Sequence, residues 1–253
     1  MIKIDRVTKK FSTKKVLDGV NLICQKGKVQ ALLGANGAGK TTLIDIVSGL
    51  SKSTKGSFYI DGEKINLDNY TYRKKVGYVF EKALFFEKLT AKEYLRFVSE
   101  MYELPKNNYL SRIEELIAFF ELPSDNSKNI ENYSKGMKKK VSLAAALIHD
   151  PNYLILDEPF DGLDFVTLEK TKRLLRKMAD NGTTILITSH QYDIVSSISD
   201  QFALLKKGKI LFNLTIAELE EKAKIQQKNI DPSVKKYLEN LMTDNKENDL
   251  SWI

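Results

Sequence analysis

The chain has 253 residues, of which 42% are hydrophobic and 29% are charged, and its formal net charge is +7. This balance excludes wholesale disorder, and the length suits one large domain or one domain with a sizeable insertion. No apolar run reaches the ~18 residues that a membrane-spanning helix needs, and the first residues lack the apolar stretch of a signal peptide. We therefore expect a protein that stays in the cytosol or is tethered there by a partner.

The basic charge and the single cysteine have ordinary explanations. Lysines are scattered along the whole chain, which favours a generally solvated basic surface over a site for nucleic acid or an anionic membrane. Cys24 permits no intrachain disulfide, and its apolar surroundings indicate a small core residue.

Short β-type runs alternate with helical patterns along most of the chain. Residues 153–156 and 183–188 are apolar and bounded by turn residues, which is typical of central strands in a parallel sheet. A helix is expected over about residues 40–48, closed by Gly49. The other expected strands are residues 2–7, 16–23, 28–33, 57–60, 76–80, 202–205 and 209–212, and the last two form a hairpin.

The stretch from residue 85 to 149 has a different pattern. It shows helical periodicity over 91–102, 110–120 and 138–148 and contains no strong strand, so we interpret it as a helical subdomain inserted into an α/β core. The core then comprises residues 1–84 and 150–214. Residues 215–253 form a C-terminal extension with helices over 216–225 and 234–242. Its polar end is expected to fray, unless Trp252 anchors on a partner.

A glycine-rich run follows the expected strand 28–33 and precedes the expected helix. It fits the phosphate-binding pattern G-x-x-x-x-G-K-[ST] and reads Gly34-Ala35-Asn36-Gly37-Ala38-Gly39-Lys40-Thr41. Glycines let the backbone curl so that successive N–H groups point at phosphate oxygens, and the helix N-terminus adds partial positive charge. In this arrangement Lys40 reaches the β- and γ-phosphates, and Thr41 offers its hydroxyl to Mg²⁺.

Two adjacent carboxylates follow the apolar strand 153–156. Asp157 is expected to orient Mg²⁺, directly or through water, and Glu158 to polarise a water for in-line attack on the γ-phosphate. Two acids at a strand end often simply begin a loop. The phosphate-binding run upstream favours the catalytic interpretation.

These residues and their surroundings resemble the ATP-binding subunit of ABC transporters. Residues 34–41 resemble the Walker A motif and 154–158 the Walker B motif. Residues 133–137, Tyr-Ser-Lys-Gly-Met, resemble the signature usually written L-S-G-G-Q, and residues 160–164 resemble the D-loop. The resemblance covers about residues 1 to 220. It implies a P-loop NTPase core with a mostly parallel sheet, an N-terminal antiparallel β part and the inserted helical subdomain.

The resemblance also implies a set of site residues and the cofactors ATP and Mg²⁺. Glu158 and His190 are the expected catalytic residues, with His190 at the γ-phosphate and the attacking water. The expected metal-binding residues are Thr41, Asp157 and Glu81. The expected nucleotide-binding residues are Phe11, Gly34, Asn36, Gly37, Ala38, Gly39, Lys40, Thr41, Thr42, Ser134, Gly136 and Asp164.

Some of these residues also have a purely structural interpretation. Phe11 matches the aromatic residue that stacks on adenine, but an aromatic near a first strand is usually core. In the family two ATPase domains pair head to tail, so Ser134 and Gly136 would face the γ-phosphate held by the partner. Ser134 is also suited to cap the following helix, and the two roles are compatible.

Two positions depart from the family pattern. The signature has Lys135 and Met137 in place of Gly and Gln, a variant similar to those of export-type subunits that serve separate membrane chains. Glu81 stands where the family has the Q-loop glutamine. Its carboxylate is able to reach Mg²⁺ or the attacking water, and the alternative is a solvated loop residue.

The expected function is ATP binding and hydrolysis in an ABC transporter, with export as the expected direction of transport. The alternative is a non-transport ABC-type ATPase that acts on ribosomes or DNA. A regulatory GTPase is disfavoured because residues 245–248 lack the Asp of N-K-x-D. The expected partners are a separate transmembrane permease chain and a second, identical or different, ATPase subunit, with no nucleic acid. A groove near residues 81–101 would receive a permease helix, with Phe85 and Phe86 either contacting it or in the core. The protein would then lie at the cytoplasmic face of the membrane, bound only through that partner.

Overall fold

The computed structural model describes residues 1–66, 71–124, 128–226 and 233–242. Its strands are β1 (Ile2–Phe11), β2 (Lys14–Cys24), β3 (Val29–Leu33), β4 (Lys55–Ile60), β5 (Glu63–Lys64), β6 (Val76–Val79), β7 (Tyr153–Asp157), β8 (Thr184–Ser189), β9 (Gln201–Lys206) and β10 (Lys209–Thr215). Its α-helices are α1 (Lys40–Val47), α2 (Ala91–Met101), α3 (Lys106–Phe120), α4 (Lys135–Leu147), α5 (Phe165–Asp180), α6 (Tyr192–Ser196), α7 (Ile216–Gln226) and α8 (Val234–Met242). Two short 3₁₀ helices in these ranges are η1 (Thr71–Lys75) and η2 (Ile130–Asn132).

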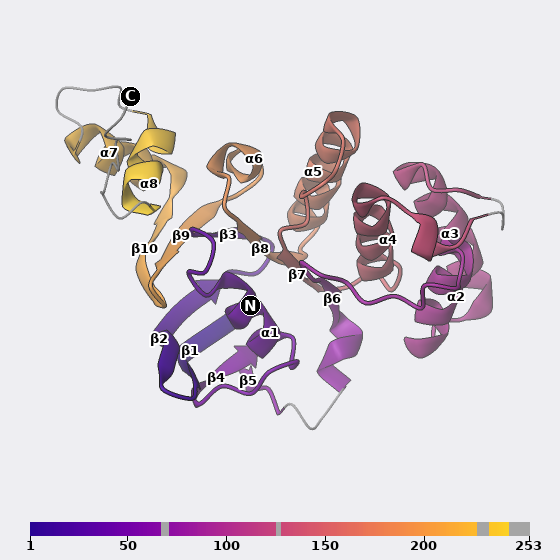
Figure 1. Cartoon of the computed structure of the whole chain (residues 1–253), viewed down its shortest axis with the longest axis horizontal. Helices are drawn as coiled ribbons and strands as arrows, with labels where there is room; N and C mark the ends of the chain where they lie inside the picture. The colour runs from indigo at the N-terminus through magenta and orange to yellow at the C-terminus, as the bar shows by residue number, and fades with distance from the viewer. Residues whose placement is uncertain (67–70, 125–127, 227–232, 243–253) are drawn as a thin grey trace, which may run out of the picture.

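A mostly parallel sheet runs through the middle of the molecule (Figure 1). Within the described residues its strand order is β10-β9-β3-β8-β7-β6, and every neighbouring pair is parallel except β10 with β9. All residues of β3, β7 and β8 are buried, as expected for parallel strands covered on both faces. The predicted parallel sheet and the predicted hairpin of β9 and β10 are therefore confirmed.

A second sheet, antiparallel throughout, packs beside α1. Its order in the described part of the chain is β2-β1-β4-β5 (Figure 1). Alternate residues of β1 such as Ile2 and Ile4 are buried, and they share one hydrophobic core with Leu43 and Ile44 of α1. That core also contains Leu32 of β3, so α1 is enclosed between the two sheets. The predicted N-terminal antiparallel part is confirmed.

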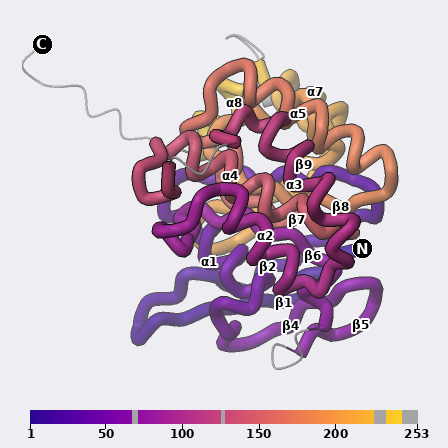
Figure 2. The backbone as a smooth tube through the Cα atoms, turned by 90° about the vertical axis from the view of Figure 1, so that its right-hand side faces the viewer, coloured from indigo at the N-terminus to yellow at the C-terminus, as the bar shows by residue number. Residues whose placement is uncertain are grey.

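Helices α2, α3 and α4 lie together beyond β6, on the right of Figure 1 and facing the viewer in Figure 2. The predicted helical character of this stretch is confirmed. Thr90 and Glu93 form a reciprocal capping box that fixes the start of α2. Phe120 and Ile113 of α3 are buried in a core that extends to the sheet. The division of the chain into a core and an inserted subdomain at residues 85 and 149 remains a prediction.

One long helix, α5, is not among the elements expected from the sequence. It packs on the sheet beside β8. Its buried positions include Thr167, Thr171, Leu175 and Ala179, which recur every four residues. Two of these are threonines whose hydroxyls bond within the first turns of the helix, so the buried face does not read as an apolar stripe. The helical period is present in the sequence but is carried partly by polar residues.

The C-terminal helices were predicted close to where they occur. Buried residues of α7 and α8 belong to the main core, among them Leu219, Tyr237 and Leu238. Trp252 lies outside the described residues, so its predicted anchoring stays a prediction.

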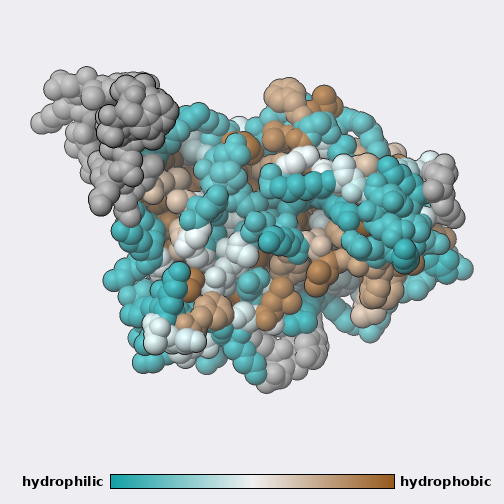
Figure 3. Space-filling view, viewed as in Figure 1, coloured by the Kyte–Doolittle hydropathy of each residue, from teal (hydrophilic) through white to brown (hydrophobic). Residues whose placement is uncertain are grey.

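Among the described helices, none combines the length and apolarity needed to cross a bilayer. Hydrophilic residues predominate on the face shown in Figure 3, with apolar side chains gathered over its middle. Cys24 is fully buried, as predicted.

Candidate functional site

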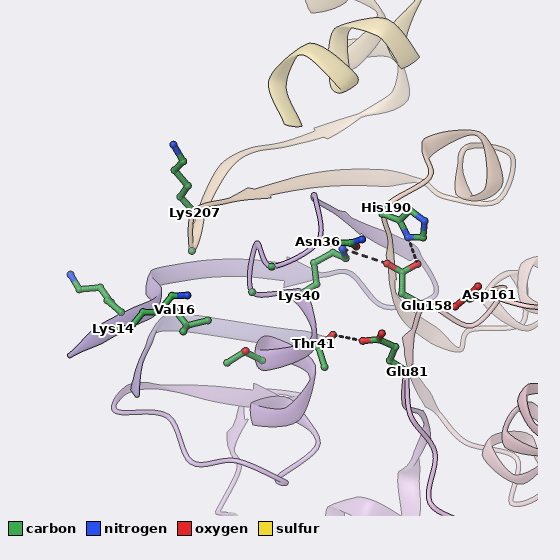
Figure 4. A pocket seen from close by; sticks show the side chains of 15 residues that line it. Lys14, Val16, Asn36, Lys40, Thr41, Glu81, Glu158, Asp161, His190 and Lys207 are labelled. Carbon is green, nitrogen blue, oxygen red and sulfur yellow. Dashed lines mark hydrogen bonds and ion pairs between the residues drawn. The ribbon is translucent and has the colours of Figure 1, made fainter. Parts of the chain in front are cut away.

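A cavity of about 660 Å³ opens where β3, β7 and β8 end and α1 begins (Figure 4). The carboxyl ends of parallel strands meet at one edge of a sheet, so side chains that follow different strands converge there. The predicted site residues that line this nucleotide-sized cavity are Asn36, Gly37, Gly39, Lys40, Thr41, Thr42, Glu81, Glu158 and His190.

The glycine-rich loop is shaped by close backbone contacts. Gly39 has φ of 110°, and a Cβ at this position would lie 2.8 Å from Leu17 Cδ2 and 3.2 Å from the Val16 carbonyl oxygen. Only glycine therefore fits without displacing β2. Gly39 also stands at the N-cap of α1 and has no side chain to cap it. The first N–H groups of α1 thus remain available to an anion, with the helix dipole reinforcing the attraction.

Lys40 is held inside the cavity although it carries a charge. Its side chain is 6% exposed, and Nζ donates a hydrogen bond of 2.7 Å to the carbonyl oxygen of Gly34. Nζ also lies 3.4 Å from Glu158 Oε1 (Figure 4). A buried ammonium that is paired in this way is oriented before any ligand arrives, and an incoming phosphate would compete for the same cation.

Asp157 at the end of β7 is buried, and burial raises the pKa of its carboxyl. The Thr188 hydroxyl donates a short hydrogen bond to Oδ1. Oδ2 is buried and has no hydrogen-bond partner among the residues that the structure describes. Such an atom costs free energy unless a ligand satisfies it, and a hard cation is the natural ligand for a carboxylate oxygen.

Two further oxygens lie near this carboxylate. Thr41 Oγ1 donates to Glu81 Oε2 at 3.2 Å, and both residues line the main cavity and a second cavity that also contains Asp157. In the described ranges no cluster of three His, Cys, Asp or Glu residues forms a protein-only metal cage. The donor set of hydroxyl and carboxylate oxygens fits Mg²⁺ carried in by substrate phosphates, because Mg²⁺ is usually bound through one or two carboxylates plus phosphates.

Glu158 adopts an uncommon backbone conformation at the cavity wall. Its φ is 45°, in the left-handed region, and its N–H donates to Thr188 Oγ1 at 3.0 Å. The side chain points toward His190, whose Nδ1 lies 3.1 Å from Glu158 Oε2 (Figure 4). Strained residues persist where surrounding structure fixes them and are concentrated at functional sites. The carboxylate therefore lies between a cation and an imidazole, in reach of the cavity.

Six predicted nucleotide-binding residues do not line the cavity, and four of them lie outside the glycine-rich loop. Ser134 caps α4, with its Oγ accepting the Met137 N–H at 3.2 Å, and a Cβ on Gly136 would lie 2.4 Å from the Gly162 carbonyl oxygen. Asp164 caps α5 and accepts hydrogen bonds from the Thr167 N–H at 2.8 Å and from the Thr167 hydroxyl. These two hydrogen bonds lower the pKa of the Asp164 carboxyl. Phe11 is 51% exposed, with Lys9 Nζ 4.7 Å from its ring centroid. Gly34 and Ala38 belong to the loop but are absent from the lining.

The structure adds lining and supporting residues that the motifs did not single out. Asp161 lines the cavity and pairs with Lys135 of α4 at 2.7 Å. Thr188 holds both Asp157 and the Glu158 backbone. The remaining additional lining residues are Lys14, Lys15, Val16, Lys207 and Gly208. Lys14 and Lys15 begin β2, and Lys207 lies in the β9–β10 turn. These segments are far apart in the sequence, so no local signal identifies the lysines.

The second cavity, of about 490 Å³, lies between the sheet edge and the helices α2 and α4. Its lining includes Leu50 and Leu84, which are 65% and 93% exposed. Phe85 packs on Tyr94 and belongs to the core periphery, whereas Phe86 is 58% exposed. The groove expected near residues 81–101 thus has a counterpart with an apolar rim.

Comparisons with known proteins agree with this geometry. A family model described as ABC transporter matches residues 17–161. The chain is 32% identical over 220 residues to the uncharacterized ABC transporter ATP-binding protein YhaQ of Bacillus subtilis, covering 87% of this chain and 73% of that protein. It is 33% identical over 223 residues to the bacitracin transport ATP-binding protein BcrA of Enterococcus faecalis, covering 88% and 71%.

A solved structure adds a likeness in three dimensions. It is an ATP-binding cassette in a dimeric post-hydrolysis state with bound ADP and phosphate. It matches with a TM-score of 0.77 and 28% sequence identity, covering 85% of this chain and 99% of that chain.

Proposed function

The chain belongs to the ABC transporter family as an ATP-binding and ATP-hydrolysing subunit, and we propose that it powers export through a separate membrane-spanning chain. The observation that carries the enzymatic part is the convergence of Lys40, Glu158 and His190 on one cavity. Export is supported by the Lys135 and Met137 variant of the signature and by the drug-transport names of relatives such as BcrA. The alternative of a ribosome- or DNA-associated ATPase gains no support from these relatives.

Nucleotide binding would begin at the glycine-rich loop. The free N–H groups at the start of α1 receive phosphate oxygens, and the Lys40 ammonium exchanges its contact with Glu158 for the β- and γ-phosphates. This exchange leaves Glu158 near the γ-phosphate but no longer paired with the lysine. Val16 lines the cavity and provides apolar surface there, whereas Phe11 is not among the lining residues. The base-stacking role of Phe11 stays a prediction.

Asp157, Thr41 and Glu81 would hold Mg²⁺ together with the substrate phosphates. The buried Asp157 Oδ2 without a hydrogen-bond partner in the described residues supports this assignment. When bound, the ion neutralises charge that develops on the transferring phosphoryl group. The Thr188 hydroxyl keeps the Asp157 carboxylate oriented through Oδ1, which leaves Oδ2 available to the ion.

Glu158 would act as the general base and His190 as its oriented neighbour. The Glu158 carboxylate is within hydrogen-bond reach of the His190 ring, and the Thr188 hydroxyl fixes its backbone. A water between the carboxylate and the γ-phosphate would lose its proton to Glu158 as its oxygen bonds to the γ-phosphorus. The bond from that phosphorus to the β,γ-bridging oxygen would break at the same time, and ADP would leave. The His190 ring then stabilises charge at the γ-phosphate.

A second subunit would complete the site. Ser134 and Gly136 lie at the start of α4 and outside their own chain's cavity, which supports a role at the nucleotide of a partner. Asp164, the cap of α5 next to this tip, would act at the same interface. The dimeric arrangement of the similar ATP-binding cassette supports such pairing.

The second cavity is the proposed docking site for a helix of the permease, which would place the chain at the cytoplasmic face of the membrane. The exposed Leu84 is the clearest anchor. We expect the chain to sediment with membranes only when it is co-expressed with a permease, such as a membrane protein encoded beside it. Leu84→Asp should remain in the supernatant while its ATP affinity is unchanged. Leu211→Asp, on the half-exposed Leu211 of β10, is the matched control. Equal sedimentation of both variants contradicts the docking site.

A further inference from the structure

The C-terminal helix α8 lies directly behind the segment that carries His190. A small cavity of about 190 Å³ separates them, and residues of both segments line it, among them His190, Gln191, Asp193, Lys235, Leu238 and Met242. This region lies beyond residue 161, where the family match ends, and about 45 residues separate the two segments along the chain. Tertiary packing therefore brings the two segments together, and no sequence motif predicts the contact.

The contact is built on buried side chains. On α8, Leu238 is 1% and Tyr237 6% exposed, and both belong to the main core. On α6, Val195 is fully buried, and the Tyr192 ring lies 5.5 Å from that of Phe202 in β9. Helix α6 has only five residues, so it has little stability of its own and depends on what packs against it.

A charge pair links the same two helices. Lys235 Nζ of α8 pairs with Asp193 Oδ2 of α6, and this carboxylate raises the pKa of the Lys235 ammonium. Both side chains are more than half exposed, at 53% and 57%. Such a pair contributes little to global stability. Its geometric effect is to fix the first turn of α6, which starts two residues after His190.

The His190 ring has few other constraints. It is 39% exposed, and its partners are Glu158 at Nδ1 and Gln191 at Nε2 (Figure 4). Its backbone is held on one side by β8, which ends at Ser189, and on the other by α6. A shift of α6 therefore moves His190 relative to Glu158. A displacement of about 1 Å at a catalytic group is enough to lower a rate by about 100-fold.

We propose that α8 is a positioning element for His190: by packing on α6 and pairing Lys235 with Asp193, the C-terminal extension sets how well the histidine meets Glu158 and so sets the rate of ATP hydrolysis. The proposal rests on the role of His190 in the proposed function. Lys235 acts through α6 and touches neither the nucleotide cavity nor Glu158, so it is a positioning residue and not a catalytic one.

The test compares variants of the full chain in steady-state hydrolysis of MgATP. Lys235→Ala should lower kcat about 3- to 5-fold with KM unchanged, a size that corresponds to loss of one exposed ion pair. Lys235→Glu, which places two like charges together, should lower it further. Lys235→Arg should retain kcat, and the charge exchange Lys235→Glu with Asp193→Lys should restore it to within about 2-fold. Lys236→Ala, at the neighbouring exposed position of α8, is the matched control and should leave kcat unchanged.

A double-mutant cycle distinguishes positioning from a structural effect. In a His190→Ala background, Lys235→Ala should cause no further loss of kcat, because its effect passes through the histidine. An equal loss in both backgrounds, or an unchanged kcat in Lys235→Glu, overturns the proposal. Full turnover in His190→Ala alone overturns instead the role of His190 in the proposed function. The two failures are therefore distinguishable.

Discussion

The glycine-rich loop at residues 34–41 and the tip of α4 at Ser134 are the two regions expected at the nucleotide, and they differ in how complete they are within one chain. At the loop, Lys40 is almost fully buried and already oriented by Gly34 and Glu158. At the tip, Ser134 is exposed and the Lys135 side chain is 70% exposed. The hydroxyl of Ser134 is engaged in capping its own helix.

This difference separates binding from hydrolysis. A preorganised loop is able to bind phosphate without a partner, because its N–H groups and cation are in place. The tip of α4 offers a helix N-terminus that lies outside the lining of its own chain's cavity, so we expect it to contribute only when a second subunit approaches. One copy should therefore bind ATP, and two copies should be needed to hydrolyse it efficiently.

The largest expected effect is a loss of kcat, and it concerns Glu158, which belongs to neither region. Glu158→Gln should lower kcat about 10²- to 10⁴-fold, because the amide cannot accept the proton of the attacking water. Its ATP affinity should be close to that of the wild type, since the loop is intact. Glu169→Gln, on a glutamate of α5 paired with Lys172, is the control and should hydrolyse ATP normally. Near-normal turnover of Glu158→Gln would remove this residue from the base role.

The next effect tests whether the loop binds alone. Lys40→Ala should raise the dissociation constant for ATP about 10- to 100-fold, the size expected for losing a hydrogen bond between charged groups. Isothermal titration calorimetry on dilute protein measures it. Lys172→Ala removes an equally buried lysine remote from the cavity and should bind ATP normally. An unchanged affinity in Lys40→Ala refutes the phosphate contact.

A smaller effect should appear at the tip of α4. Ser134→Ala removes both the helix cap and the hydroxyl offered to the partner's nucleotide, whereas Ser134→Asn keeps a capping side chain. We expect Ser134→Ala to cost about 1 kcal/mol of unfolding free energy and Ser134→Asn only a fraction of that. Both should lower kcat about 10-fold while the ATP affinity of a single subunit is retained. If only Ser134→Ala loses activity, capping alone accounts for the residue.

The last effect is on folding stability and not on activity, and it concerns His149, a residue outside the comparison. His149 stacks on Tyr102 with ring centroids 3.7 Å apart, and burial lowers the pKa of its imidazole from 6.5 to about 4. Between these values the unfolded chain binds the proton and the folded one does not, so unfolding free energy falls as pH drops from 6.5 to 4. The full loss is about 3 kcal/mol. Urea denaturation should show this dependence reduced in His149→Gln, and an equal pH dependence in both proteins would contradict it.

The fold was largely predictable because its determinants are local. The buried runs of β3, β7 and β8 and the glycine-rich loop carry their own signals. Helix α5 was missed because Thr167 and Thr171 occupy its buried face. In the site, Lys40, Glu158 and His190 were found through motifs and their roles remain predictions. The contact of α8 with α6 depends on tertiary packing of residues about 40 apart, for which one sequence contains no signal.

The most direct test of a shared nucleotide is the mass of the Glu158→Gln protein in solution, measured by light scattering with and without MgATP. We predict a monomer without nucleotide and twice that mass with it, and we expect Ser134→Ala to weaken the doubling. Because Cys24 is fully buried, cysteines placed at Asn36 and Lys135 would be the accessible thiols, and they should cross-link between chains only in the ATP state. A Glu158→Gln protein that binds MgATP and stays monomeric at high concentration would contradict the account.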